Sequence, residues 1–226
     1  MQNINIKLDF ETRGFNMFNE NIFKLDKDQI NKSFDLHFKN PKFRDNNYKN
    51  VAILNFKDVK ETLYLNILNE IIKIFKDNNL NYDFDCLWLQ NSNHSFSQSN
   101  VNELPFIPHI DKRRCLKVMI YLNDIKKNAG PINLAKTNPS NFENIRRNLE
   151  VDYQIKKKNV IKSIPLEKYI SCEGNFGTSI FFDTNTPHFA GQINDKKVYR
   201  KILRFTFLKP MNKTSKIRYY FKKIFN

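Results

Sequence analysis

The chain has 226 residues, of which 40% are hydrophobic and 14% aromatic, and this is enough to build one packed domain and excludes wholesale disorder. Only five Gly and eight Pro are present, which excludes a low-complexity or collagen-like chain. The formal net charge of +15 attracts anions such as nucleic acid, acidic lipid surfaces or phosphorylated small molecules, but no run of five or six basic residues marks a nucleic-acid-binding arm.

The first 50 residues give a weak pattern. Apolar residues alternate from Ile4 to Phe10, which predicts a strand, and Gly14 ends it. Residues 22–38 mix polar and aromatic side chains and predict a short helix with a loop, which Pro41 closes.

A stronger signal follows from residue 51. Residues 51–56 form an apolar run of strand length. Asp58 then offers a helix N-cap, and Glu61 stands at the spacing of a capping box. Apolar residues recur at helical spacing beyond it, so we predict a helix over residues 59–76 whose apolar stripe lies on the outer face of a sheet.

The rest of the chain reads as short strands. Their predicted ranges are 82–90, 106–111, 116–123, 132–135, 176–183, 188–193 and 199–208. Residues 91–103 are polar without periodicity and predict a loop, whereas residues 138–164 look helical and irregular. Several short strands after a helix predict a β-sandwich or barrel with helices outside it.

Two motifs far apart in sequence hold the candidate metal ligands. The first is Pro108-His109-Ile110-Asp111, and the second is Thr186-Pro187-His188-Phe189. Residues two apart on a strand point to the same face, so His109 and Asp111 can aim at one point. A later strand can bring His188 to that point. Two histidines and one carboxylate form the ligand set of non-haem Fe(II) oxygenases.

The order of these features resembles the Fe(II)/2-oxoglutarate dioxygenases, and within them the phytanoyl-CoA dioxygenase-like family. The likeness extends from about His109 to Phe207. Three further segments carry it: residues 116–124 are similar to the strand after the His-x-Asp pair, residues 128–132 to its glycine turn, and residues 177–183 to the strand before the distal histidine.

The resemblance implies a fold and a division of the chain. It implies a mainly β fold with flanking helices around a double-stranded β-helix core, the jelly-roll of cupin-like proteins. We expect one domain over residues 1–226. Within it, residues 1–80 would support a catalytic core at 81–209 that carries a helical insertion at about 138–164, and residues 210–226 would form a basic C-terminal segment.

The resemblance also implies a reaction. His109, Asp111 and His188 would be the metal ligands and the catalytic residues, with Fe(II), 2-oxoglutarate and O₂ as cofactor and cosubstrates. The expected activity is hydroxylation of a small, anionic metabolite with release of succinate and CO₂. In related halogenases a small residue replaces the carboxylate ligand to admit halide, so Asp111 favours hydroxylation or another oxidation.

The candidates for binding 2-oxoglutarate are Arg200, Arg204 and Tyr121. Arg200 lies twelve residues after the second histidine ligand, about where the family places the arginine that holds the far carboxylate. Arg204 points to the same strand face and is the rival, with Ile202 between them where some relatives carry a hydroxyl residue. Met119 and Tyr121 point one way from their strand, so we expect one of them to line the pocket, with core packing favoured for Met119.

Two other functions stay open. One is a non-catalytic jelly-roll binding module, against which the complete set of ligands argues. The other is a hydroxylase of a macromolecule, a protein or a nucleic acid, favoured only by the net charge. We expect a small substrate, phosphorylated or carboxylated, and no nucleic acid. The basic residues Lys112, Arg113 and Arg114 either attract such an anion or form a solvated turn.

The remaining expectations concern the location of the protein. Cys86, Cys115 and Cys172 are widely spaced and match no Cys-x-x-Cys pattern, which is typical of reduced thiols in a cytoplasmic protein. The N-terminus shows no signal peptide, and no apolar run approaches a membrane span of about 18 residues.

The C-terminal segment has an amphipathic pattern. Its apolar residues from Ile217 to Phe225 fall on one helical face, and lysines and arginines supply charge around it. Such a helix either contacts an anionic membrane peripherally or folds back onto the domain, and we favour the interpretation that it folds back.

Overall fold

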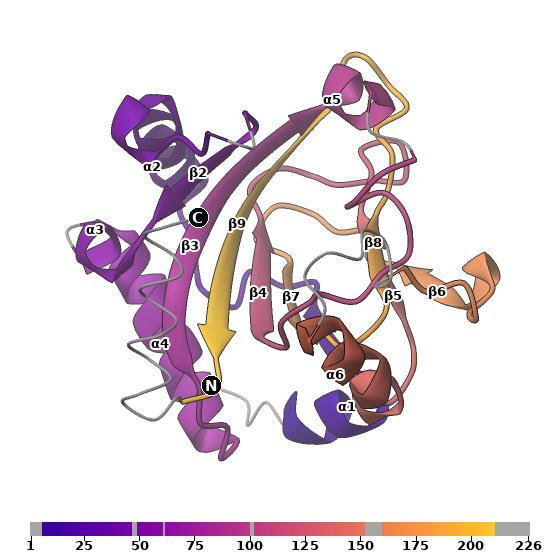
Figure 1. Cartoon of the computed structure of the whole chain (residues 1–226). Helices are drawn as coiled ribbons and strands as arrows, with labels where there is room; N and C mark the ends of the chain where they lie inside the picture. The colour runs from indigo at the N-terminus through magenta and orange to yellow at the C-terminus, as the bar shows by residue number, and fades with distance from the viewer. Residues whose placement is uncertain (1–5, 47–48, 61, 100–101, 152–159, 211–226) are drawn as a thin grey trace.

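The computed structural model describes residues 6–46, 49–60, 62–99, 102–151 and 160–210. Their strands form two antiparallel sheets (Figure 1). The large sheet has the order β1(Phe15–Phe18)-β7(Ser179–Asp183)-β4(Leu116–Tyr121)-β9(Tyr199–Leu208)-β3(Asp83–Asn93)-β2(Val51–Leu54). The small sheet has the order β6(Tyr169–Ser171)-β5(Ile132–Ala135)-β8(His188–Ala190).

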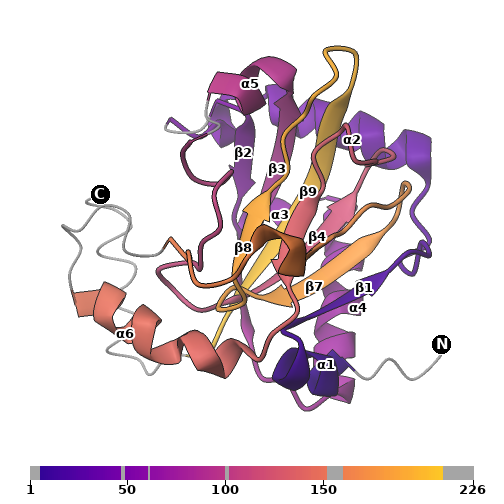
Figure 2. The same ribbon diagram turned by 90° about the vertical axis from the view of Figure 1, so that its right-hand side faces the viewer.

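Helices cover the outer face of the large sheet. Figure 2 shows α2 and α4 behind this sheet and β8 in front of it. The helices are α1(Ile6–Thr12), α2(Lys27–Lys39), α3(Phe56–Lys60), α4(Tyr64–Asp77), α5(His94–Ser99) and α6(Glu143–Val151), with 3₁₀ turns at Pro41–Phe43, Pro139–Phe142 and Leu166–Lys168. None of the described helices is long and apolar enough to cross a membrane.

Strand alternation divides the side chains of the large sheet between two environments. On β9, Leu203, Phe205 and Phe207 point outward and pack with α2 and α4 in the main core. Ile202, on the opposite face, packs with β4, β5 and β7 side chains in a second cluster. The space between the sheets is therefore lined by the inner residues of β3, β4 and β9.

This architecture confirms the mainly β fold with flanking helices and a jelly-roll core. The predicted strands at 132–135 and 199–208 match β5 and β9 in their bounds. Strands β1 and β2, from the first 80 residues, form the two edges of the large sheet. The predicted amphipathic helix at the C-terminus lies outside the described residues.

The N-terminal strand prediction is wrong, because α1 occupies this segment. Ile6 and Phe10 are both buried, and residues four apart also share one face of a helix, so the same apolar pattern suits either structure. Gly14 has φ +81°, in the region that favours glycine, and separates α1 from β1.

The predicted helix over residues 59–76 is two helices, α3 and α4, and it begins earlier. The side chain of Asn55 accepts from the amides of Lys57 and Asp58, and Asp58 accepts from the amide of Asn55. Asn55 therefore caps α3, and Asp58 is its reciprocal partner rather than the cap.

Several other segments also differ from the prediction. The loop expected at 91–103 begins with the end of β3 and contains α5. The strand expected at 106–111 is reduced to isolated bridges at His109, and β6 was not predicted. Within the irregular helical stretch at 138–164, the structure describes a 3₁₀ turn and α6. These are short pieces fixed by tertiary contacts, which local patterns specify weakly.

Candidate metal centre and its cavity

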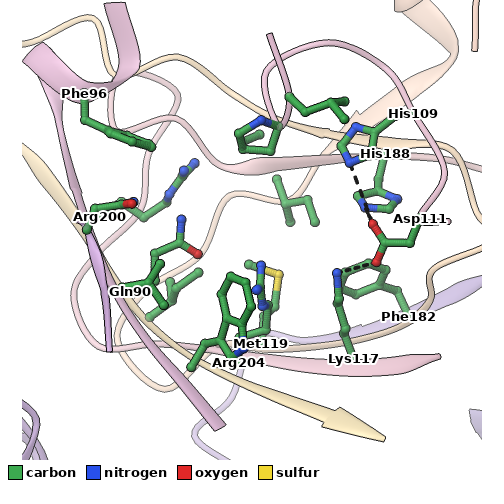
Figure 3. A pocket seen from close by; sticks show the side chains of 18 of the residues that line it. Gln90, Phe96, His109, Asp111, Lys117, Met119, Phe182, His188, Arg200 and Arg204 are labelled. Carbon is green, nitrogen blue, oxygen red and sulfur yellow. Dashed lines mark hydrogen bonds and ion pairs between the residues drawn. The ribbon is translucent and has the colours of Figure 1, made fainter. Parts of the chain in front are cut away.

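Three side chains from distant segments converge at one point between the sheets. One ligand atom each from His109, Asp111 and His188 lies within 4.8 Å of the others. The Nε2 atoms of His109 and His188 are 3.9 Å and 3.6 Å from Oδ1 of Asp111. Figure 3 shows the two rings above the carboxylate at one side of the cavity. This agrees with the spacing argument from the sequence.

Backbone pairing brings the two histidines side by side. The amide of His109 donates to the carbonyl of His188 at 2.9 Å, and the amide of His188 donates to the carbonyl of His109 at 2.8 Å. The amide of Asp111 donates to the carbonyl of Thr184 at 3.1 Å. The site therefore depends on one antiparallel bridge between residues 79 positions apart in sequence.

The tautomer of both histidines is set by carbonyl groups. Nδ1 of His109 lies 2.8 Å from the carbonyl of Ile107, and Nδ1 of His188 lies 2.8 Å from the carbonyl of Thr186. A carbonyl only accepts, so each Nδ1 carries a proton, and Nε2 is the nitrogen that a neutral ring can offer to a metal. Such outer contacts orient histidine ligands in metal sites.

Charge in the site suits a divalent metal. Burial, together with the neighbouring His188, lowers the pKa of His109 to about 3, so its imidazole is neutral at neutral pH. Burial acts to raise the pKa of Asp111, but Lys117 and the two histidines hold it well below its usual range. Nζ of Lys117 is 2.5 Å from Oδ2 of Asp111. Two imidazoles and an ionised carboxylate fit Fe(II) with positions left open.

A cavity of about 440 Å³ opens from this point. Its walls come from β3, β4 and β9 of the large sheet, from β8, and from the segment before the first histidine. Among the described residues that line it, four are cationic, Lys112, Lys117, Arg200 and Arg204, whereas Asp111 is the single carboxylate. The volume suits small molecules, and the charge suits anions.

Arg200 is a buried cation that pairs with no carboxylate among the described residues. Its residue is 3% exposed, and its guanidinium donates to the carbonyls of Gly130 and Gly191. Its Nε has no hydrogen-bond partner among the described residues, and no carboxylate forms an ion pair with it there. Burial lowers the pKa of Arg200 to about 10. A buried arginine that no described carboxylate neutralises is suited to a ligand that carries one.

The two carbonyls that meet Arg200 depend on a close backbone approach. Gly130 has φ +67°, and a Cβ at this position would lie 2.4 Å from the carbonyl oxygen of Gly191. Only glycine fits a positive φ with so little space. The predicted glycine turn thus has a physical role, since it allows the backbone of this turn to lie close to Gly191, directly after β8.

The other two candidates for the cosubstrate lie differently. The guanidinium carbon of Arg204 is 3.8 Å from the ring centroid of Trp88, and Arg204 lines the cavity. Tyr121 is fully buried, and its hydroxyl donates to the carbonyl of Cys172 at 2.7 Å. Met119 lines the cavity instead. We therefore do not carry Tyr121 forward as a ligand for 2-oxoglutarate.

The basic triplet does not act as a unit. Lys112 is exposed and lines the cavity, whereas Arg114 pairs with Asp183 at 2.6 Å and with Glu143 at 3.4 Å. Sequence reasoning missed Lys117 and Trp88. The signal for Lys117 was available, because alternation on its strand places it on the same face as Met119.

Comparisons with known proteins give a consistent picture of the fold. No family model matches the chain, and no curated protein matches it significantly. Several solved structures match the chain in fold. SnoK, a non-haem α-ketoglutarate-dependent carbocyclase from nogalamycin biosynthesis, has a TM-score of 0.62 at 12% identity over 89% of this chain and 82% of its own.

Two other solved structures are similar. EvdO2 from Micromonospora carbonacea var. aurantiaca, complexed with 2-oxoglutarate, has a TM-score of 0.54 at 12% identity over 91% of this chain and 90% of its own. HygX from Streptomyces hygroscopicus, with nickel and 2-oxoglutarate bound, has a TM-score of 0.55 at 10% identity over 89% of this chain and 85% of its own. These likenesses show a shared fold. The narrower likeness to the phytanoyl-CoA dioxygenase-like family stays a prediction.

Proposed function

We propose that this chain is a non-haem Fe(II)- and 2-oxoglutarate-dependent oxygenase that hydroxylates a small, anionic metabolite and releases succinate and CO₂. The observation that carries the proposal is the convergence of His109, Asp111 and His188 in a cavity that also holds a buried arginine with no carboxylate partner among the described residues. The similar folds of SnoK, EvdO2 and HygX, each described with α-ketoglutarate or 2-oxoglutarate, support it.

The residues take the following roles. His109, Asp111 and His188 hold the metal through Nε2, Oδ1 and Nε2, the atoms that face one another. Arg200 binds the distal carboxylate of 2-oxoglutarate, because it is a buried cation with no acidic partner in the described part of the chain. When bound, iron and 2-oxoglutarate together supply the oxidation by O₂ that the side chains themselves cannot perform.

The protein keeps the ligand set rigid. The carbonyls of Ile107 and Thr186 fix the imidazole rings, and Lys117 holds the second oxygen of Asp111. Lys117 thereby keeps this carboxylate ionised and turned so that Oδ1 faces the histidines. The apolar ring of Phe182 packs against His188 with centroids 5.3 Å apart and limits water at this side.

The test is a measurement of cosubstrate binding and turnover. Under anaerobic conditions, Fe(II) and 2-oxoglutarate together should give the weak visible metal-to-ligand band of this enzyme class. Admission of O₂ should then yield succinate, even slowly without the true substrate. A band without any succinate over many hours would favour the non-catalytic binding module, and absence of metal binding would refute the proposal.

A further inference from the structure

The cavity has a second cationic wall that is separate from Arg200. On the inner face of the large sheet, Arg204 of β9 stands opposite Trp88 of β3 and opposite Met119 of β4. Lys117 is two residues before Met119, so it is a diagonal neighbour of Arg204 on the same face, with Cβ atoms roughly 7–8 Å apart. Both cations line the cavity, and long side chains at this spacing can reach one ligand group.

Trp88 holds the guanidinium of Arg204 in a defined orientation. A distance of 3.8 Å from the guanidinium carbon to the ring centroid is that of a face-on contact. A guanidinium group that lies over a ring can still donate N–H hydrogen bonds within its own plane. Arg204 is half-buried beside this ring, so its charge is screened less than that of a surface arginine.

The two arginines are placed for different ligand groups. They are four residues apart on β9, which corresponds to about 13 Å between Cα atoms along a strand. Ile202 lies between them, paired with Gln90. Figure 3 shows Arg200 and Gln90 at one end of the cavity, whereas Arg204 lies below the centre, on the side of Lys117.

The positive charge of the cavity favours binding of a second anion in addition to 2-oxoglutarate. A divalent metal and dianionic 2-oxoglutarate cancel each other's charge. The four lining cations then face a single carboxylate, which leaves an excess of three positive charges. Lys112 is exposed at the rim, so deeper in the cavity Lys117, Arg200 and Arg204 carry three positive charges against the one negative charge of Asp111. An unbalanced excess in a partly closed space costs free energy unless an anion binds there.

We propose that Arg204, stacked on Trp88, and Lys117 form a subsite for an oxyanion of the substrate, a carboxylate or a phosphate group. The inference rests on the proposed oxygenase function and names the substrate class of that site. Arg204 offers its planar N–H edge, and Lys117 has three donors, one of which goes to Asp111. Because Lys117 contacts a metal ligand, this subsite holds the charged end of the substrate beside the metal.

The protein carries its own probe for this subsite. Trp88 is its single tryptophan, so intrinsic tryptophan fluorescence reports on the contact with Arg204. The protein is loaded with Mn(II) and saturating 2-oxoglutarate and titrated with inorganic phosphate or with acetate, at ionic strength held constant with sodium chloride. A saturable change in Trp88 emission with one of these oxyanions, absent with chloride, is expected. Comparison of the two oxyanions distinguishes a phosphate subsite from a carboxylate subsite.

Matched variants assign the response to residues. Arg204→Gln should weaken oxyanion binding by about tenfold or more, and Arg204→Lys by less, because it keeps the charge without the planar edge. Lys117→Gln, measured with saturating metal, should weaken it too. Arg147→Gln is the control, since it removes a charge from an exposed arginine on α6 and should leave the response unchanged. Circular dichroism checks that each variant is folded.

Cosubstrate binding separates this inference from the proposed function. Arg204→Gln should keep the visible band of Fe(II) and 2-oxoglutarate, which shows that its fold and metal site are intact. No saturable response in the wild type, or an equal response in Arg204→Gln, would overturn the subsite while the oxygenase assignment stands. A variant Arg204→Gln that loses the band while Arg200→Gln keeps it would make Arg204 the cosubstrate anchor and would also overturn the subsite. If the wild type gives no band at all, the proposed function fails instead.

Discussion

Replacement of Arg200 by methionine should have opposite effects on the free protein and on the cosubstrate complex. In the free protein, burial lowers the pKa of Arg200 from 12.5 to about 10, which corresponds to a cost of about 3 kcal/mol in the free energy of unfolding. A folded-state pKa below the unfolded value makes this cost fully present below about pH 10, and therefore at neutral pH.

Two hydrogen bonds offset part of that cost. Arg200 donates to the carbonyls of Gly130 and Gly191, and each such bond contributes about 1 kcal/mol. Methionine fills a similar volume without charge. We therefore expect Arg200→Met to raise the free energy of unfolding of the free protein by about 1 kcal/mol.

Binding of 2-oxoglutarate should reverse the order of stability of the two proteins. At a 2-oxoglutarate concentration 100 times its Kd, the free energy of unfolding of the metal-loaded wild type should rise by about 2.7 kcal/mol. Arg200→Met should gain little, because loss of one partner of a buried charge pair costs about 2–5 kcal/mol of binding free energy. The wild type is then the more stable protein.

The assay is urea unfolding of both proteins with Mn(II), with and without 2-oxoglutarate, and Arg204→Gln serves as the control that should keep the gain. Two results would refute the reasoning. One is a strong destabilisation of free Arg200→Met, which would make Arg200 a structural residue. The other is an equal stabilisation of both proteins by 2-oxoglutarate.

Three further predictions follow from the structure and the sequence. Asp111→Ala should abolish the visible band, and His109→Ala and His188→Ala should each lose Fe(II) in metal analysis; unchanged metal content in both histidine variants would show that the ligands are misassigned. Gly130→Ala should lower the free energy of unfolding by about 1–3 kcal/mol in urea unfolding. The alanine would combine a positive φ with a Cβ that lies 2.4 Å from a carbonyl oxygen. A neutral effect would mean that the turn relaxes freely. A chain truncated after Met211 should lose stability in urea unfolding if the C-terminal segment folds back onto the domain, as we favour. If the segment contacts membranes instead, the truncated chain should keep its 2-oxoglutarate turnover and lose cosedimentation with anionic vesicles, each basic residue contributing about 1 kcal/mol. A full-length chain that never cosediments at low salt would end the membrane hypothesis.

The sequence by itself determined the features that depend on short spacings. A two-residue spacing fixes which face of the chain a side chain takes, so the spacing alone paired His109 with Asp111. The same alternation placed Arg200 and Arg204 on one face of β9. The bounds of β5 and β9 also followed from their apolar patterns.

Tertiary structure decided what depends on residues far apart in sequence. The approach of His188 to His109 comes from a backbone bridge across 79 positions, and the sequence could only anticipate it through a resemblance. The contact of Lys117 with Asp111 and the stacking of Arg204 on Trp88 needed strand order and register, which no local pattern encodes. The segment at Ile6 became a helix because its apolar pattern satisfied two periods, and burial against the rest of the fold selected between them.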